Sequence, residues 1–180
     1  MIKFSELKAV GVEAYGGVGA WVYDEWQKLN ATFFMGENIP GAIDWVSAPP
    51  NYSMGCYLFS ENRIFLHKGL VRPRYPTNWP EWCLDNLNQR LASDVLLHEM
   101  IHQRIRQTGG WDGESSHNNK RFVSEVNRIA ALLGLKVTAK VIQAQRIDGK
   151  RRLKVEGGCL SLGEIENFPY SKRPYGYYYG

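Results

Sequence analysis

The chain has 180 residues, of which 44% are hydrophobic and 22% are charged, with a formal net charge of +4. These proportions are those of an ordinary folded domain and exclude a chain that is disordered throughout. No run approaches the ~18 consecutive apolar residues of a membrane span, and Met1–Ala20 lacks the ordered segments of a signal peptide. Cys56, Cys83 and Cys159 are far apart, so no disulfide framework is expected, and a reducing, cytoplasmic compartment fits best.

The N-terminal part of the chain predicts one clear helix. Residues 1–20 show no dominant pattern: Ser5 is suited to cap a short helix, and the glycine-rich run 16–19 is typical of a loop. That run is not a phosphate-binding loop, because no Lys-Ser/Thr pair follows the glycines. From Trp21 to Phe33, apolar residues recur at 22, 26, 29 and 33, which is the spacing of an amphipathic helix.

Three short strands are predicted next. Ala42–Val46 is the first, and the aromatic and branched runs 55–60 and 63–67 flank a Glu61-Asn62 turn. The second and third runs have the composition and spacing of a β-hairpin. His67 ends this hairpin, and we expect it to be a strand-end surface residue rather than a metal ligand.

After a proline-rich connector, residues 98–102 read His-Glu-Met-Ile-His, an H-E-x-x-H pattern within a predicted helix over 84–107. Positions four apart lie one turn above each other, so His98 and His102 project from one face, in the middle of an apolar arc. This geometry suits two ligands of one zinc ion, with Glu99 at the flank as general base. The alternative is a chance match of two surface histidines, which the four histidines of the chain make rare.

A catalytic zinc site has three protein ligands and keeps a water, so the pattern needs one more ligand. His117 is the favoured candidate, because it stands at the start of a second predicted helix over 118–133. Glu125 on that helix is an alternative, and the loop acids Asp112 and Glu114 are weaker ones.

The C-terminal part of the chain is basic. Residues 135–180 hold nine Lys/Arg and four acidic residues, whereas the remainder holds thirteen and fourteen. The runs 135–146 and 151–162 are predicted strands joined by a tight Asp148-Gly149 turn. Such a region suits a polyanionic partner such as nucleic acid, and a solvated charged hairpin is the alternative. Its densest basic cluster is Lys150, Arg151, Arg152 and Lys154.

The order of the predicted elements is helix, strand, hairpin, H-E-x-x-H helix and downstream histidine. The motifs on them are Leu29-Asn30, Phe33-Phe34, Ile43-Asp44-Trp45, Gly55, Arg63-Ile64-Phe65-Leu66, His98-Glu99-Met100-Ile101-His102 and His117-Asn118-Asn119-Lys120-Arg121-Phe122. With these motifs the chain resembles the SprT-like/Spartan family of zinc metalloproteases over roughly residues 21–133. The resemblance implies a histidine third ligand at position 117 and substrates bound to DNA. The cysteine zinc ribbon that many members carry is replaced here by the predicted hairpin and a tyrosine-rich tail.

We therefore expect an α+β fold with a minimal zincin-like domain over 1–134, whose zinc-binding helix packs on a small antiparallel sheet. A C-terminal β-hairpin and basic tail follow over 135–180. The expected ligands of one catalytic Zn²⁺ are His98, His102 and His117. The expected function is a zinc metalloendopeptidase with Glu99 as base, a protein or peptide substrate, and single-stranded or protein-crosslinked DNA as a partner, without membrane association. The alternatives are a non-proteolytic zinc-containing nucleic-acid-binding module and a general metallopeptidase with no DNA link.

Overall fold

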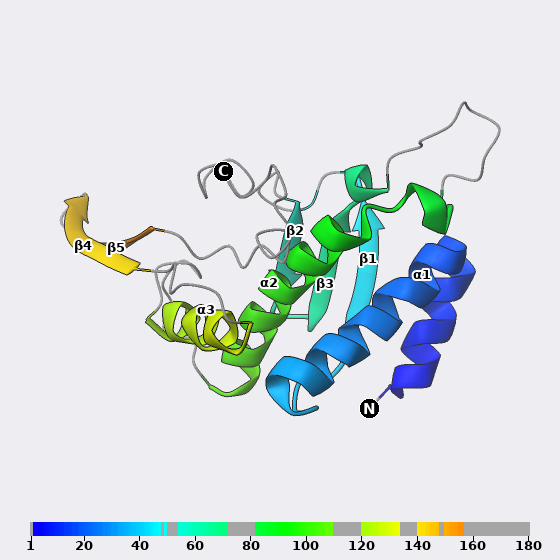
Figure 1. The fold of residues 1–180 in the computed structure, drawn as a ribbon, viewed down its shortest axis with the longest axis horizontal. Helices are drawn as coiled ribbons and strands as arrows, with labels where there is room; N and C mark the ends of the chain where they lie inside the picture. The colour runs from blue at the N-terminus through cyan, green and yellow to red at the C-terminus, as the bar shows by residue number, and fades with distance from the viewer. Residues whose placement is uncertain are drawn as a thin grey trace.

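The computed structural model describes residues 2–47, 49, 54–71, 82–109 and 120–133, and the backbone of 140–147 and 150–156. This part of the chain has an α+β architecture, with helices on a three-stranded sheet and a separate two-stranded ladder (Figure 1). The elements are α1 (Phe4–Phe34), β1 (Ala42–Val46), β2 (Gly55–Leu58), β3 (Arg63–His67), α2 (Gln89–Gln107), α3 (Lys120–Leu132), β4 (Lys140–Ile147) and β5 (Lys150–Glu156). None of the described helices has the length and apolar character needed to cross a membrane.

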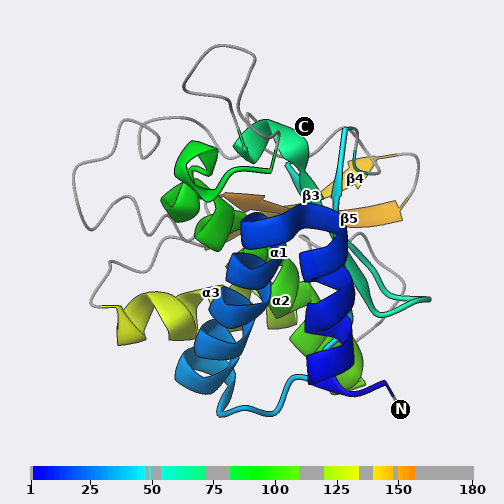
Figure 2. The ribbon, with the colours of Figure 1, turned by 90° about the vertical axis from the view of Figure 1, so that its right-hand side faces the viewer.

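Helix α1 is folded back on itself into two arms that lie side by side (Figure 2). The bend is at Gly16, whose φ of 54° and ψ of −132° are not helical and suit a residue without a Cβ. The arms approach closely where Gly11 and Gly19 meet, since a Cβ on Gly19 would lie 1.9 Å from the carbonyl oxygen of Gly11. The predicted loop over 16–19 is therefore wrong, because the glycines after the bend continue the helix and allow the arms to pack.

Strands β1, β2 and β3 form a mixed sheet in the order β1-β3-β2. β2 and β3 are antiparallel, with Gly55 opposite Leu66, and β1 and β3 are parallel, with Ile43 opposite Ile64. The predicted strand and hairpin are confirmed, but the expected antiparallel sheet is wrong. The hairpin turn reverses the chain, so β3 runs opposite to β2 and in the same direction as β1. Because β3 lies between them, β1 and β3 form a parallel pair and β2 is an outer strand.

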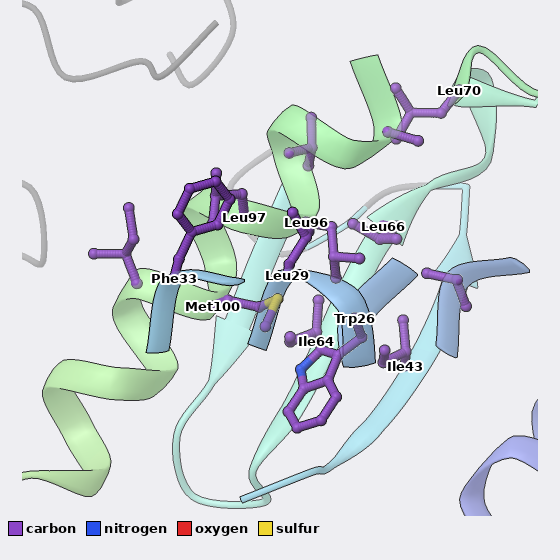
Figure 3. Close-up of a cluster of buried hydrophobic side chains, with 14 of the residues drawn as sticks. Trp26, Leu29, Phe33, Ile43, Ile64, Leu66, Leu70, Leu96, Leu97 and Met100 are labelled. Carbon is purple, nitrogen blue, oxygen red and sulfur yellow. The ribbon is translucent and has the colours of Figure 1, made fainter. Parts of the chain in front are cut away.

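The hydrophobic core lies between one face of this sheet and the helices α1 and α2 (Figure 3). The second arm of α1 contributes the four positions predicted from their helical spacing, Val22, Trp26, Leu29 and Phe33. The sheet contributes Ile43, Trp45, Ile64 and Leu66, and α2 contributes Leu96, Leu97, Met100 and Ile101. Burial of these side chains is the main favourable term for the fold and fixes α2 against the sheet.

Helix α2 is the central helix and contacts α1, the sheet and α3. It begins at Gln89, where Asn88 Oδ1 accepts a hydrogen bond of 3.2 Å from the Leu91 amide. Leu84–Asn86 forms a separate 3-10 turn, so the helix starts later than predicted. Because three elements cover α2, its buried residues extend beyond the predicted arc, and they include Ala92, Ser93, Leu96, Met100 and Gln103.

The described parts of the C-terminal elements overlap the predicted ones. Helix α3 falls within the predicted span 118–133, and its core face is Phe122, Val126 and Ile129. Strands β4 and β5 run antiparallel, with Ile147 opposite Lys150. The predicted Asp148-Gly149 turn, Cys159 and the tyrosine-rich tail lie outside the described residues. Cys56 and Cys83 are both free thiols.

Candidate metal centre

His98 and His102 converge on the same side of α2, as their four-residue spacing predicts. Their Nε2 atoms are 3.1 Å apart. His98 is 4% exposed, and His102 is half-buried. Phe122 of α3 packs on both imidazoles. Its ring is stacked on that of His102, with 4.6 Å between the ring centroids, and it meets the ring of His98 edge-on, with 5.1 Å between the centroids. The aromatic contact holds both rings in place, so the pair presents its nitrogens from a fixed position.

The spacing of the two nitrogens fits a single metal ion. Two nitrogens that bind one tetrahedral zinc ion at about 2.0–2.1 Å are themselves about 3.3 Å apart. The Nε2 atoms of His98 and His102 lie close to that separation, at 3.1 Å. Neutral imidazoles are among the preferred ligands of zinc. The pair could therefore supply two adjacent corners of a tetrahedral zinc site.

Glu99 is buried between α2 and the outer strand β2. It is 3% exposed, and the backbone N–H of Tyr57 donates a hydrogen bond to its carboxylate. The approach is possible because residue 55 is glycine: a Cβ on Gly55 would lie 2.9 Å from Glu99 Oε1 and 2.5 Å from Val95 Cγ1. Burial raises the pKa of Glu99 from 4.5 to about 8, and the Tyr57 amide opposes part of that rise.

This carboxyl group is suited to proton transfer near neutral pH. A dication nearby would favour the carboxylate and lower the pKa of Glu99 toward neutrality. A general base is most effective when its pKa lies near the working pH. The prediction placed Glu99 only at the flank of the helix, whereas the structure buries it against β2.

The third ligand is not decided by the described residues. His117, Asp112 and Glu114 lie outside them, and within them no third His, Cys, Asp or Glu joins the two histidines to form a metal-binding group. Glu125 binds Arg128 instead, with a 2.5 Å contact from its Oε1 to the Arg128 guanidinium. That guanidinium also donates to the Phe33 carbonyl oxygen, which draws the pair toward α1.

His67 has a structural role. Its Nδ1 accepts a hydrogen bond of 2.9 Å from the Gly69 amide and so caps the 3-10 turn Lys68–Leu70. One ring nitrogen is thereby engaged at the end of β3. The predicted position of His67 at the end of the hairpin is confirmed.

Three features of the site were not predicted. The contact of Gly55 with Glu99, the hydrogen bond from the Tyr57 amide and the stacking of Phe122 on the histidines all depend on pairs of residues distant in sequence. Phe122 was expected to be buried because of its helical spacing, but that spacing does not name its partner. Gly55 is the first residue of the predicted strand run 55–60, and a glycine in a strand is a signal of close approach.

The predicted basic cluster is divided between the two faces of β5. Alternate residues of a strand share a face, so Lys150, Arg152 and Lys154 lie on one side of the ladder and Arg151 on the other. Opposite them on β4 are Ile147, Gln145 and Gln143 for the first face and Arg146 for the second.

The fold and the α2 site define an α+β domain whose central helix presents two convergent histidines and a buried carboxylic acid. In comparisons with known proteins, no family model, no curated protein and no solved structure matches the chain. The activity of the site is therefore inferred from the geometry of α2 and β2.

Proposed function

We propose that the protein is a zinc-dependent metalloendopeptidase of minimal zincin-like architecture, as its resemblance to SprT-like proteases suggests. One observation carries the proposal: the His98 and His102 Nε2 atoms are 3.1 Å apart, and Glu99, the residue after His98 on the same helix, has a buried carboxyl group. A purely structural zinc site has no use for such an acid, whereas hydrolysis of a peptide bond needs a base beside the metal.

His117 is proposed as the third ligand. It precedes Phe122, which stacks on His102, by five residues. A chain of five residues reaches up to about 17 Å, so Phe122 keeps His117 within range of the histidine pair. Three histidines would leave one position of a tetrahedral ion open for water.

The chemistry assigns one main task to Glu99. A bound zinc ion would lower the pKa of its water to about 7 and polarise the peptide carbonyl. A carboxylate oxygen of Glu99 accepts the proton of the attacking water and then passes it to the nitrogen of the leaving amine. Because Glu99 is held by the Tyr57 amide and packs against Gly55, it keeps one orientation during both transfers.

The outer edge of β2 is proposed as the substrate-binding edge. Among the described strands β2 pairs only with β3, and Glu99 lies directly against it. An extended peptide can add to such an edge through backbone hydrogen bonds, as an additional strand of the sheet. The scissile bond then passes the carboxyl group of Glu99, which explains why the acid lies against an outer strand.

Metal analysis with a peptide hydrolysis assay tests the proposal. The wild-type protein should bind one zinc ion, and His117→Ala should lose it. Glu99→Gln should keep zinc but lose hydrolysis by at least ~10³-fold, because the proton acceptor is missing. Glu125→Gln is the matched control, since it changes an acid that binds Arg128 outside the site and should keep both zinc and activity. Hydrolysis by Glu99→Gln at the wild-type rate would contradict the proposal.

A DNA-associated substrate is proposed from the β4–β5 ladder. Arg146 and Arg151 lie directly opposite each other, and like charges in such a pair destabilise a ladder unless an anion lies nearby. On the other face, Lys150, Arg152 and Lys154 follow each other at intervals of about 6.6 Å. This regular row of cations suits the phosphates of single-stranded DNA, free or crosslinked to protein.

Substitutions on one face of β5 test the DNA proposal in the full-length protein. If three cations contact phosphates, the combined change of Lys150, Arg152 and Lys154 to Gln should reduce the salt-dependence slope of single-stranded DNA binding by about 2. The control is Arg146→Gln with Arg151→Gln, which removes charge from the opposite face. An unchanged slope in the triple variant would instead favour a metallopeptidase with no DNA link. Zinc and DNA binding without hydrolysis would favour the non-proteolytic module.

A further inference from the structure

One side of α2 holds the β2–β3 hairpin at two points. At the first point, Val95 and Glu99 lie against Gly55 of β2. At the second, Gln103 and Gln107 donate hydrogen bonds of 2.9 and 3.2 Å to Asn62 Oδ1. All four helix residues follow at intervals of four, so they lie along the same side of α2.

The two points are separated by a distance that matches the strand. From Glu99 to Gln107 the helix rises by about 12 Å. The four residues of β2 extend over about 10 Å. The strand therefore runs along α2 and is fastened near each of its ends, with Glu99 at one end and the Asn62 turn at the other.

Asn62 joins three elements. Its Oδ1 also accepts a hydrogen bond of 3.1 Å from the Tyr57 hydroxyl, and its Nδ2 donates to the carbonyl oxygens of Ile39 and Pro40 at 3.4 and 3.1 Å. Its φ of 49° is a left-handed value that Asn adopts more readily than most residues. The hairpin turn, the loop before β1 and helix α2 thus meet at a single side chain.

This joint is polar and extends from the half-buried Asn62 and Gln107 into the interior of the protein. Gln103 is fully buried, and its Oε1 accepts a hydrogen bond of 3.2 Å from Trp26 Nε1. Apolar side chains of the same volume would pack at least as stably, because buried polar groups lose their hydration. Hydrogen bonds, unlike apolar contacts, require a defined distance and direction. The joint therefore defines where the turn stands relative to α2.

We propose that Asn62, held by Gln103 and Gln107, is a positioning residue that sets the outer edge of β2 relative to Glu99. The inference rests on the proposed function, because that edge is where a peptide substrate would lie. Without the joint, β2 keeps its contacts with α2 at Gly55 and at the Tyr57 amide, and it tilts away from α2 toward its turn. A displacement of about 1 Å at a reacting bond lowers the rate by as much as ~100-fold.

Two variants remove the joint while keeping the backbone. Asn62→Gly keeps the left-handed conformation and removes all five side-chain hydrogen bonds. Gln103→Met keeps the length of the side chain. The matched control is Ser93→Ala, which removes a buried hydrogen bond of 2.9 Å to Glu25 between α2 and α1, away from the hairpin. All three should lower the melting temperature.

The diagnostic readout is the dependence of hydrolysis on substrate length. Two fluorogenic peptides with the same scissile bond are compared, one of about ten residues and one of about four, which is too short to pair along β2. In both joint variants kcat/KM for the long peptide should fall at least ~10-fold, with zinc content and the short peptide unchanged within ~2-fold. Ser93→Ala should leave the ratio of the two peptides at its wild-type value. An equal loss for both peptides, or no loss, would overturn the positioning role.

Hydrogen exchange gives a second readout that does not depend on activity. In Asn62→Gly the amides of Gly55–Leu58 should exchange faster than in the wild type, while those of β1 keep their protection. If the wild-type protein hydrolyses neither peptide, the proposed function fails, and exchange still decides whether Asn62 holds β2. Unchanged exchange of β2 overturns the inference in either case. If Asn62→Gly does not fold, Gln103→Met and Gln107→Met answer the same question.

Discussion

Helix α2 contributes to two groups of buried and half-buried polar side chains, which are held in different ways. The amide cluster fastens α2 to the hairpin turn. It consists of the side-chain amides of Asn62, Gln103 and Gln107, together with the Trp26 indole that donates to Gln103. The histidine–acid cluster lies one turn earlier on the helix and consists of His98, Glu99 and His102. The first is neutral and its members bind one another, whereas every member of the second can gain or lose a proton.

The difference separates a structural joint from the proposed functional site. Hydrogen bonds between neutral amides are the same at any pH near neutrality and need no ligand. The histidine–acid cluster has a charge state that depends on protons and on any bound cation, as the pKa of about 8 for Glu99 shows. Buried ionisable groups of this kind are typical of functional sites. The two clusters should therefore respond differently to metal, pH and substitution.

The largest expected difference is in the response to zinc. His98→Ala should abolish zinc binding and lower peptide hydrolysis by at least ~10³-fold, because water is no longer activated. Added zinc should raise the melting temperature of the wild type but not of His98→Ala, since a ligand stabilises only the state that binds it. Gln103→Met should keep full zinc stoichiometry. Stoichiometric zinc in His98→Ala, measured by elemental analysis, would place the metal elsewhere.

The next difference is in the pH dependence of stability without metal. Folded Glu99 keeps its proton up to about pH 8, whereas its ordinary pKa is 4.5, so between these values the folded state binds more protons than the unfolded state. The contribution of Glu99 to the free energy of unfolding should be full below pH 4.5 and fall as the pH rises to 8, by an amount on the order of several kcal/mol. Urea unfolding of the metal-free protein at several pH values measures this slope.

Glu99→Gln is the control for that slope, because it replaces the acid by a neutral group of the same shape. Its metal-free form should be more stable than the wild type at pH 8 and should lose most of the pH dependence. Zinc should have a similar effect on the wild type, since a cation favours the carboxylate. A wild-type slope that persists in Glu99→Gln would assign the titration to another group.

The contact between the histidine–acid cluster and β2 predicts a smaller effect. Gly55→Ala places a Cβ 2.5 Å from Val95 Cγ1 and 2.9 Å from Glu99 Oε1, so the strand or the acid has to move. Overpacking of this kind destabilises by about 1–3 kcal/mol, and the shifted carboxyl group should also lower hydrolysis. Gly17→Ala in helix α1 is the control. Among the described residues, its new Cβ would meet only the Cβ of Leu84, at an ordinary contact distance of 3.7 Å. A Gly55→Ala protein of wild-type activity would show that Glu99 does not depend on this contact.

Local patterns predicted the elements but not their partners. The helical spacing from Val22 to Phe33 and the strand-forming runs at Ala42–Val46 and Arg63–His67 are local signals, and the helix and strands that they predict were confirmed. The parallel pairing of β1 with β3 and the joint at Asn62 link residues far apart in sequence, where periodicity carries no information. The glycines at 16–19 were misread because close packing of the α1 arms overrides their low helix propensity.

The substitution with the smallest expected effect on stability tests most directly whether the amide cluster and the histidine–acid cluster are independent. Gln107→Ala removes hydrogen bonds of 2.8 and 2.9 Å to the backbone of Ile39 and one to Asn62, at a half-buried position where water replaces them in part. Stability should fall by about 1 kcal/mol. Because only neutral groups are involved, the loss should be the same at pH 6 and pH 8 and with or without zinc, in urea unfolding at all four conditions. A loss that varied with zinc or pH would mean that the joint and the histidine–acid cluster are energetically coupled through β2, and the amide cluster would then belong to the functional site.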